Sequence, residues 1–151
     1  MKFVFAFVFT IIFGSLVSAQ LFSIEDLSKL NSMDEDNFQK EMTKYKFIGF
    51  DKIESSKVKV INYSDENASL AKEIAKNNNA TSKITYSFES KVFFDNYFKL
   101  ISELKFQPVL QEQTADGMVK HYKKGNQILK LIDTQDPITD VKIYRIEVSQ
   151  E

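Results

Sequence analysis

The sequence predicts an α+β fold in which two tandem α-β-β-β-β units form one antiparallel sheet with helices packed on one face. Three observations lead to this prediction: a repeat at a spacing of 59 residues, helical periodicity at the start of each copy, and short strand-like segments after it. Two copies are fewer than a solenoid needs, so we expect one fused, two-layer, saddle-like domain.

The repeat appears when the chain is aligned with itself at a shift of 59 residues. Segment 36–47 then lies over segment 95–106 with five identical positions. The same shift matches further pairs without a gap: Val60 with Val119, Tyr63 with Tyr122, Asn67 with Asn126, and Lys83-Ile84 with Lys142-Ile143. We therefore expect repeat units at 32–90 and 91–151, which share one fused domain (20–151) with a lead-in helix at 20–31.

Each copy is expected to open with an amphipathic helix. In the first copy, Ser32 and Glu35 have the spacing of a capping box. In the second copy, Ser90 is the expected N-cap. Apolar residues at helical spacing follow each cap: Phe38, Met42 and Tyr45 in the first helix, and Phe94, Tyr97, Phe98, Ile101 and Leu104 in the second. Ser23 and Asp26 predict the start of the lead-in helix in the same way.

Strand-like segments separated by turn residues follow each helix. In the second copy the turns carry Asp116-Gly117, Gly125-Asn126 and Asp136-Pro137. The expected strands are Ile48–Glu54, Val58–Ser64 and Lys83–Glu89 in the first copy, and Phe106–Gln113, Met118–Lys124, Gln127–Asp133 and Asp140–Ser149 in the second. One segment is in conflict, because Ser69–Lys76 has helix-favouring residues where the repeat requires a strand. We follow the repeat and predict a strand there.

The first 19 residues predict a cleaved export signal. Lys2 precedes an apolar run from Phe3 to Val17, and small residues end it, so we expect cleavage between Ala19 and Gln20. An uncleaved membrane anchor is the alternative, but it needs about 20 apolar residues, and Gly14 and Ser15 interrupt the run. The end of the segment, LVSAQ, resembles signal-peptide ends of Gram-negative bacteria. We expect a bacterial protein that is secreted or periplasmic after cleavage.

Composition removes several kinds of chemistry. The chain has no cysteine, which excludes disulfides, thiolate metal sites and a cysteine nucleophile. His121 is the only histidine, Arg145 is the only arginine, and no glycine-rich phosphate loop is present. From Gln20 onward, 19 basic and 21 acidic side chains give a net charge of −2, which disfavours nucleic acid as a partner. We expect no cofactor, no metal and no catalytic constellation.

Weak site candidates remain. His121, Lys123 and Lys124 could form a small basic patch for an anion, although a solvated hairpin tip explains them better. The carboxylates Asp133 and Asp136, and the acidic run 34–36, are the only support for hydrolase chemistry, and turn formation and helix capping explain them more simply. The tyrosines form either an aromatic platform or part of the core: Tyr63, Tyr86, Tyr122 and Tyr144.

These observations favour an exported, non-catalytic binding protein that uses the open face of its sheet. The expected partner is another exported or envelope protein. A small-ligand carrier with a pocket between helices and sheet, lined by Phe93, Phe94 and Phe98, is the alternative, and a carboxylate-dependent hydrolase ranks last. The sequence gives neither the oligomeric state nor any indication whether the sequons at Asn62, Asn67 and Asn79 are glycosylated.

Overall fold

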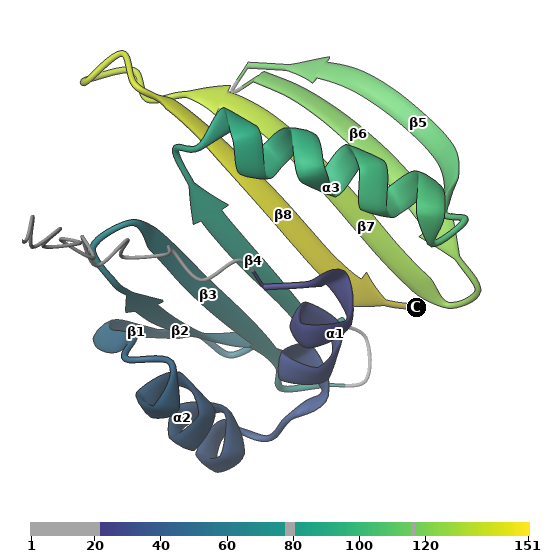
Figure 1. Cartoon of the computed structure of the whole chain (residues 1–151). Coiled ribbons are helices and arrows are strands. Elements are labelled where there is room, and N and C mark those ends of the chain that lie inside the picture. Colours follow the sequence, from purple (N-terminus) through teal and green to yellow (C-terminus); the bar gives the residue numbers. More distant parts are fainter. Residues whose placement is uncertain (1–21, 78–80, 116) are drawn as a thin grey trace, which may run out of the picture.

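A computed structural model describes residues 22–77, 81–115 and 117–151. These residues form three helices and one sheet of eight antiparallel strands, as expected for an α+β protein (Figure 1). The predicted signal, its cleavage point between Ala19 and Gln20, and the sequon at Asn79 lie outside the described residues.

The elements follow one another as α, α, then four strands, then α and four more strands. The helices are α1 (Ile24–Ser32), α2 (Glu35–Lys44) and α3 (Lys91–Glu103). The first four strands are β1 (Ile48–Glu54), β2 (Val58–Ser64), β3 (Ala68–Ala75) and β4 (Lys83–Phe88), and the last four are β5 (Gln107–Thr114), β6 (Gly117–Lys124), β7 (Gln127–Gln135) and β8 (Lys142–Gln150). In the sheet their order is β1-β2-β3-β4-β8-β7-β6-β5, so β4 and β8 join the two halves and β1 and β5 are the edges.

The two halves share local geometry at a spacing of 59 residues. Lys46 and Lys105 both follow a helix with positive φ, at 61° and 60°. The pairing of β1 with β2 is irregular at Phe50, and that of β5 with β6 is irregular at Val109. Opposite residues correspond as well, since Tyr63 pairs with Leu70 in one half and Tyr122 pairs with Leu129 in the other.

The last strand departs from this spacing. Leu70 pairs with Tyr86, whereas its counterpart Leu129 pairs with Val148, so the matching positions of β4 and β8 are 62 residues apart. The ungapped alignment of Lys83-Ile84 with Lys142-Ile143 is therefore wrong. The longer hairpin between β7 and β8 accommodates the three additional residues.

Side chains cap the N-terminus of every described helix. Ser23 forms the predicted capping box with Asp26, and Ser90 accepts a hydrogen bond from the Phe93 backbone N–H as expected. The prediction for α2 is wrong, because Asp34 rather than Ser32 is the N-cap and accepts from the Asn37 N–H at 2.8 Å. Ser32 is instead the last residue of α1, which extends further than the periodicity indicated.

The β3 strand confirms the prediction for the segment with helix-favouring residues. Leu70 and Lys72 are both buried, and the residues beside them are half-buried, which is the alternation of a strand with one face in the core. Pairing on both sides with β2 and β4 outweighs the weak helical preference of Ala71, Lys72 and Glu73.

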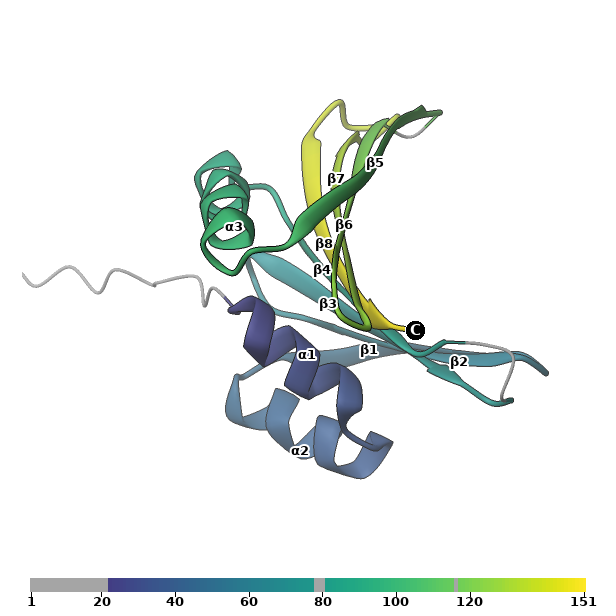
Figure 2. The same ribbon diagram turned by 90° about the vertical axis from the view of Figure 1, so that its right-hand side faces the viewer.

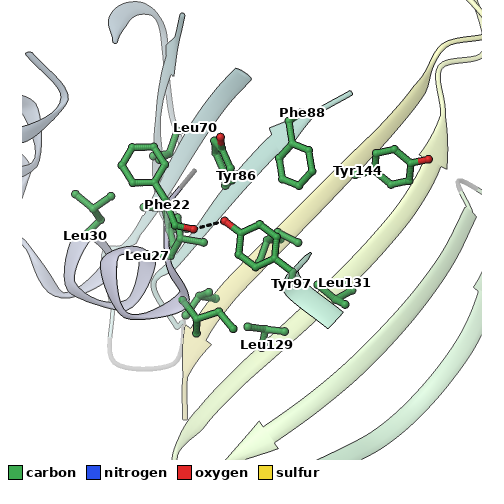
Figure 3. Close-up of a cluster of buried hydrophobic side chains, with 14 of the residues drawn as sticks. Phe22, Leu27, Leu30, Leu70, Tyr86, Phe88, Tyr97, Leu129, Leu131 and Tyr144 are labelled. Carbon is green, nitrogen blue, oxygen red and sulfur yellow. Dashed lines mark hydrogen bonds between the residues drawn. The ribbon is translucent and has the colours of Figure 1, made fainter. Parts of the chain in front are cut away.

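One core links the helices with the buried side of the sheet. Phe22, just before α1, packs against Tyr86 of β4 with ring centroids 5.3 Å apart, and its carbonyl accepts a hydrogen bond from the Tyr97 hydroxyl of α3 (Figure 3). Figure 2 shows α1 and α2 beside the β1–β4 half and α3 beside the β5–β8 half. The same core includes Leu70 and Leu129, one from each half.

Candidate functional site

The side of the sheet opposite the core residues is called the open face here. Its side chains alternate with the buried ones along each strand, and most are half-buried. In the middle of the sheet it consists of Ser69, Ala71 and Glu73 on β3, Lys83, Thr85 and Ser87 on β4, Arg145, Glu147 and Ser149 on β8, and Lys130 and Ile132 on β7.

A charge network crosses the middle of the open face. The Lys83 Nζ lies 3.3 Å from a Glu147 oxygen and 3.6 Å from a Glu73 oxygen, and the Lys130 Nζ lies 3.1 Å from the other Glu147 oxygen. Glu147 is only 9% exposed beneath the two lysines. Burial lowers the pKa of Lys83, but the attraction of Glu147 and Glu73 outweighs it and raises the pKa overall. The network is therefore a fixed, charge-balanced strip across β3, β4, β8 and β7.

Apolar side chains flank this strip in both halves. Ile48 and Ile53 of β1 lie opposite Ser64 and Val60 of β2, which places both isoleucines on the open face, and they are 73% and 57% exposed. In the other half Leu110 of β5 lies opposite His121 and is 52% exposed. The open face thus has a polar centre between two apolar margins, a composition typical of protein-binding surfaces.

A groove of about 650 Å³ lies at one end of the sheet, beside the start of α3. Its apolar lining includes Tyr86, Phe88 and Phe93. Its carboxylates are Asp65, Glu66 and Glu89, and its remaining lining residues are Ser64, Asn67, Ala68, Ser69, Ser87, Ser90 and Ile143. This volume falls within the usual range for small-molecule sites. A second hollow, between α3 and the sheet at Phe94 and Phe98, has about 200 Å³.

The predicted basic patch is divided between different neighbours. The His121 Nε2 lies 2.9 Å from a Glu112 oxygen, Lys123 pairs with Glu151, and the Lys124 Nζ lies 5.7 Å from the centre of the Phe106 ring. Because side chains alternate along β6, Lys123 and Lys124 point to opposite sides of the sheet. The structure does not bring the three side chains together, and anion binding by any of them stays a prediction.

The candidate carboxylates hold local structure. Asp133 pairs with the Lys142 Nζ at 3.0 Å, while Asp136 accepts hydrogen bonds from two backbone N–H groups of its own turn, which lower its pKa. Asp34 caps α2, and hydrogen bonds from Lys59 and then Lys52 lower the pKa of Glu35. Across the described ranges no group of three or more histidine, aspartate or glutamate side chains is arranged to hold a metal ion.

The four tyrosines contribute to the core rather than to an exposed platform. Tyr63, Tyr86 and Tyr144 are buried, and Tyr122 is half-buried against the same core. Burial raises the pKa of Tyr86 and of Tyr63. Tyr63 and Tyr122 occupy matching positions on β2 and β6, as the repeat predicts for residues with a shared packing role.

Sequence reasoning missed two features. Lys72 is 1% exposed, and its ammonium donates to three backbone carbonyls, those of Leu30, Asn31 and Met33, at 2.5–2.8 Å. A charged residue at the i+2 position from Leu70 on the apolar side of β3 was the available signal. The groove gave no such signal, since its carboxylates and aromatic rings come from three separate segments.

Comparisons with models of known protein families, with curated proteins and with solved structures find no match. Among the helices of the described residues, none is long and apolar enough to cross a membrane. The functional argument therefore depends on the geometry of this chain alone.

Proposed function

We propose that this chain is an exported, non-catalytic binding protein whose partner, another exported or envelope protein, docks on the open face of the sheet. The observation that carries the proposal is the composition of that face. Half-buried apolar side chains and a charge-balanced strip cover the central strands, and three isoleucine or leucine side chains on the edge strands are more than half exposed. Contiguous apolar surface with a polar centre is characteristic of docking surfaces.

The proposal takes the two α-β-β-β-β units as copies of one ancestor, with the helices on one face so that the other stays free. The matching irregularities at Phe50 and Val109, and the matching positive φ at Lys46 and Lys105, support a common origin. Both copies would then contribute half of one pseudo-symmetric binding surface across β4 and β8.

Capture of the partner on immobilised protein tests this function. The mature chain from Gln20 is exposed to envelope extract and culture fluid of the source organism, beside two variants. Thr85→Arg places a long cation in the centre of the open face, beside Glu147. Gln39→Arg makes the same change in charge on an exposed position of α2. We expect one stoichiometric partner that wild type and Gln39→Arg retain, and at least about tenfold weaker binding by Thr85→Arg.

Two outcomes would contradict the proposal. A partner that binds Thr85→Arg as well as wild type would use a different surface, and the absence of any retained protein would remove the stable-complex hypothesis. Circular dichroism of both variants establishes that they are folded before capture.

The groove supports a second candidate, a carrier of small ligands. Its volume of about 650 Å³ and its aromatic lining suit a drug-sized molecule. Native mass spectrometry of the unfractionated protein is the test: a bound small molecule that Phe93→Ala releases would favour the carrier over the docking module.

A further inference from the structure

The described chain begins at a firmly held residue beside the groove. Phe22 is 1% exposed, and its ring packs edge-on against Tyr45 and Tyr86 at 5.0 and 5.3 Å. Its carbonyl accepts the hydroxyl hydrogen of Tyr97, a residue of α3 (Figure 3). The start of the described chain is thus fixed between the two halves, and Tyr86, which contacts it, also lines the groove.

The groove has a pronounced charge imbalance. Its lining includes three carboxylates and no lysine or arginine. Asp65 accepts hydrogen bonds from the Asn67 and Ala68 backbone N–H groups, while Glu66 and Glu89 are exposed and form no ion pair within the described residues. Elsewhere many exposed glutamates pair with lysine, as Glu54 and Glu151 do. A group that fits the groove would therefore carry positive charge and an apolar part for the aromatic floor.

We propose that the groove receives the first residues of the mature chain itself, with the Leu21 side chain on the floor formed by Phe88 and Phe93 and the Gln20 α-amino group beside Glu66 and Glu89. Cleavage after Ala19 leaves two residues before Phe22, and two extended residues reach about 7 Å. The new α-amino group is positively charged near neutral pH, unlike the backbone amide of the uncleaved chain. The inference rests on the predicted cleavage point and is independent of docking at the open face.

The chemistry of an N-terminal glutamine provides a direct test. The free α-amine attacks the side-chain amide carbon of Gln20, the new N–C bond closes a five-membered lactam, the bond to the amide nitrogen breaks, and ammonia leaves. A protonated amine held beside carboxylates cannot attack. The mature chain 20–151 is incubated at pH 8, and mass spectrometry follows the loss of ammonia. We expect cyclisation in the folded wild type to be about tenfold slower than in Glu66→Gln/Glu89→Gln, a difference that one unit of amine pKa produces.

A matched control separates local pairing from net charge. Asp36→Asn/Glu103→Gln also removes two exposed carboxylates, on α2 and at the end of α3, and is expected to cyclise at the wild-type rate. Equal rates for wild type and Glu66→Gln/Glu89→Gln, with both folded by circular dichroism, would overturn the proposal. A mass for the exported protein that corresponds to a start other than Gln20 would also overturn it.

The apolar contact has its own readout. Leu21→Ser removes the group assigned to the aromatic floor, and we expect the thermal midpoint to fall by about 3–8 °C. The same substitution in a Glu66→Gln/Glu89→Gln background is expected to have a smaller effect, because the segment is then already displaced. An unchanged midpoint for Leu21→Ser would contradict the placement of this side chain.

Discussion

The two halves of the sheet place very different side chains in one matching position. Lys72 on β3 and Leu131 on β7 are 59 residues apart, and each is 1% exposed. Leu131 lies in a purely apolar part of the core, near Phe94 and Tyr144. Lys72 lies beneath α1 and donates to the carbonyls of Leu30, Asn31 and Met33 at the end of that helix.

The difference follows from α1, which only the N-terminal half has. The last carbonyls of a helix have no partner within the helix, and they attract cations. An ammonium has three hydrogens to donate, so Lys72 satisfies three carbonyls at once, and its Nζ also lies 5.1 Å from the centre of the Phe38 ring. One added helix has therefore determined which residue a buried sheet position can hold.

Leu131→Lys gives the largest expected effect. It places an ammonium in a part of the core where no helix end supplies acceptors. We expect the free energy of unfolding to fall by about 3–5 kcal/mol, the usual effect of an uncompensated buried charge. Urea denaturation followed by circular dichroism measures the change. Ile128→Lys on the same strand, at a half-buried open-face position, is the control and is expected to lose far less. Equal losses would mean that the two sides of β7 do not differ in polarity as described.

Lys72→Leu makes the N-terminal position resemble its counterpart. The leucine fits the apolar surroundings but leaves three carbonyls at the end of α1 without a donor. We expect a loss of about 2–3 kcal/mol, since an unsatisfied buried acceptor costs about 1–3 kcal/mol and water can reach part of the helix end. Amide hydrogen exchange would locate the loss in α1, whereas α3 would keep its protection. Wild-type stability or better would show that hydrogen bonding to the helix end contributes nothing net.

The same lysine predicts a pH dependence. Burial lowers the pKa of Lys72 to about 8, from 10.5 in an exposed lysine, although Asp34 acts in the opposite direction. Between these two values the unfolded chain binds one more proton at this site than the folded chain, so the free energy of unfolding rises with pH. From pH 8 to pH 10 the rise amounts to about 2–3 kcal/mol.

Comparison with Lys72→Leu isolates this contribution. Other lysines and tyrosines also titrate near pH 10, but they are common to both proteins, so the difference between wild type and variant reports Lys72 alone. The measurement is urea denaturation at several values of pH between 7 and 10. Parallel stability curves would contradict a lowered pKa and would indicate that the carbonyls hold the proton as firmly as water does.

Local patterning and the repeat predicted much of this fold. The bounds Ile48–Glu54 and Val58–Ser64 agree with β1 and β2, because alternation and flanking turns lie within a few residues of each other. The repeat also assigned the strand at β3 correctly against local propensity. The three-residue shift in β8 was missed, because a short ungapped match of Lys-Ile pairs resembled the true register.

The candidate site was less accessible to prediction. Strand alternation fixes which side chains share a face, so the existence of an open face followed from the pattern. The network of Glu73, Lys83 and Glu147 requires the order of the strands, and β4 next to β8 is a contact between residues about 60 positions apart. The groove likewise depends on how the β2–β3 turn approaches α3, which no local pattern records.

The smallest expected effect sharpens the comparison at a second matching position. Ile61 of β2 is 7% exposed, and its counterpart Lys120 of β6 lies with its Nζ 4.6 Å from the centre of the Phe98 ring. Lys120→Ile would make β6 resemble β2. We expect a change of at most about 1 kcal/mol, because the isoleucine replaces a cation–π contact worth about 0.5–1 kcal/mol with apolar contact to the same ring.

Lys123→Ile is the control for that change, because it removes a cation from the opposite side of the same strand. It loses the pair with Glu151 and has no ring below it, so its effect should be close to zero and should depend on salt. Thermal unfolding at low and high salt distinguishes the two variants. A loss for Lys120→Ile of several kcal/mol would mean that Lys120 holds α3 in place as Lys72 holds α1, and that both halves depend on a lysine at the helix–sheet boundary.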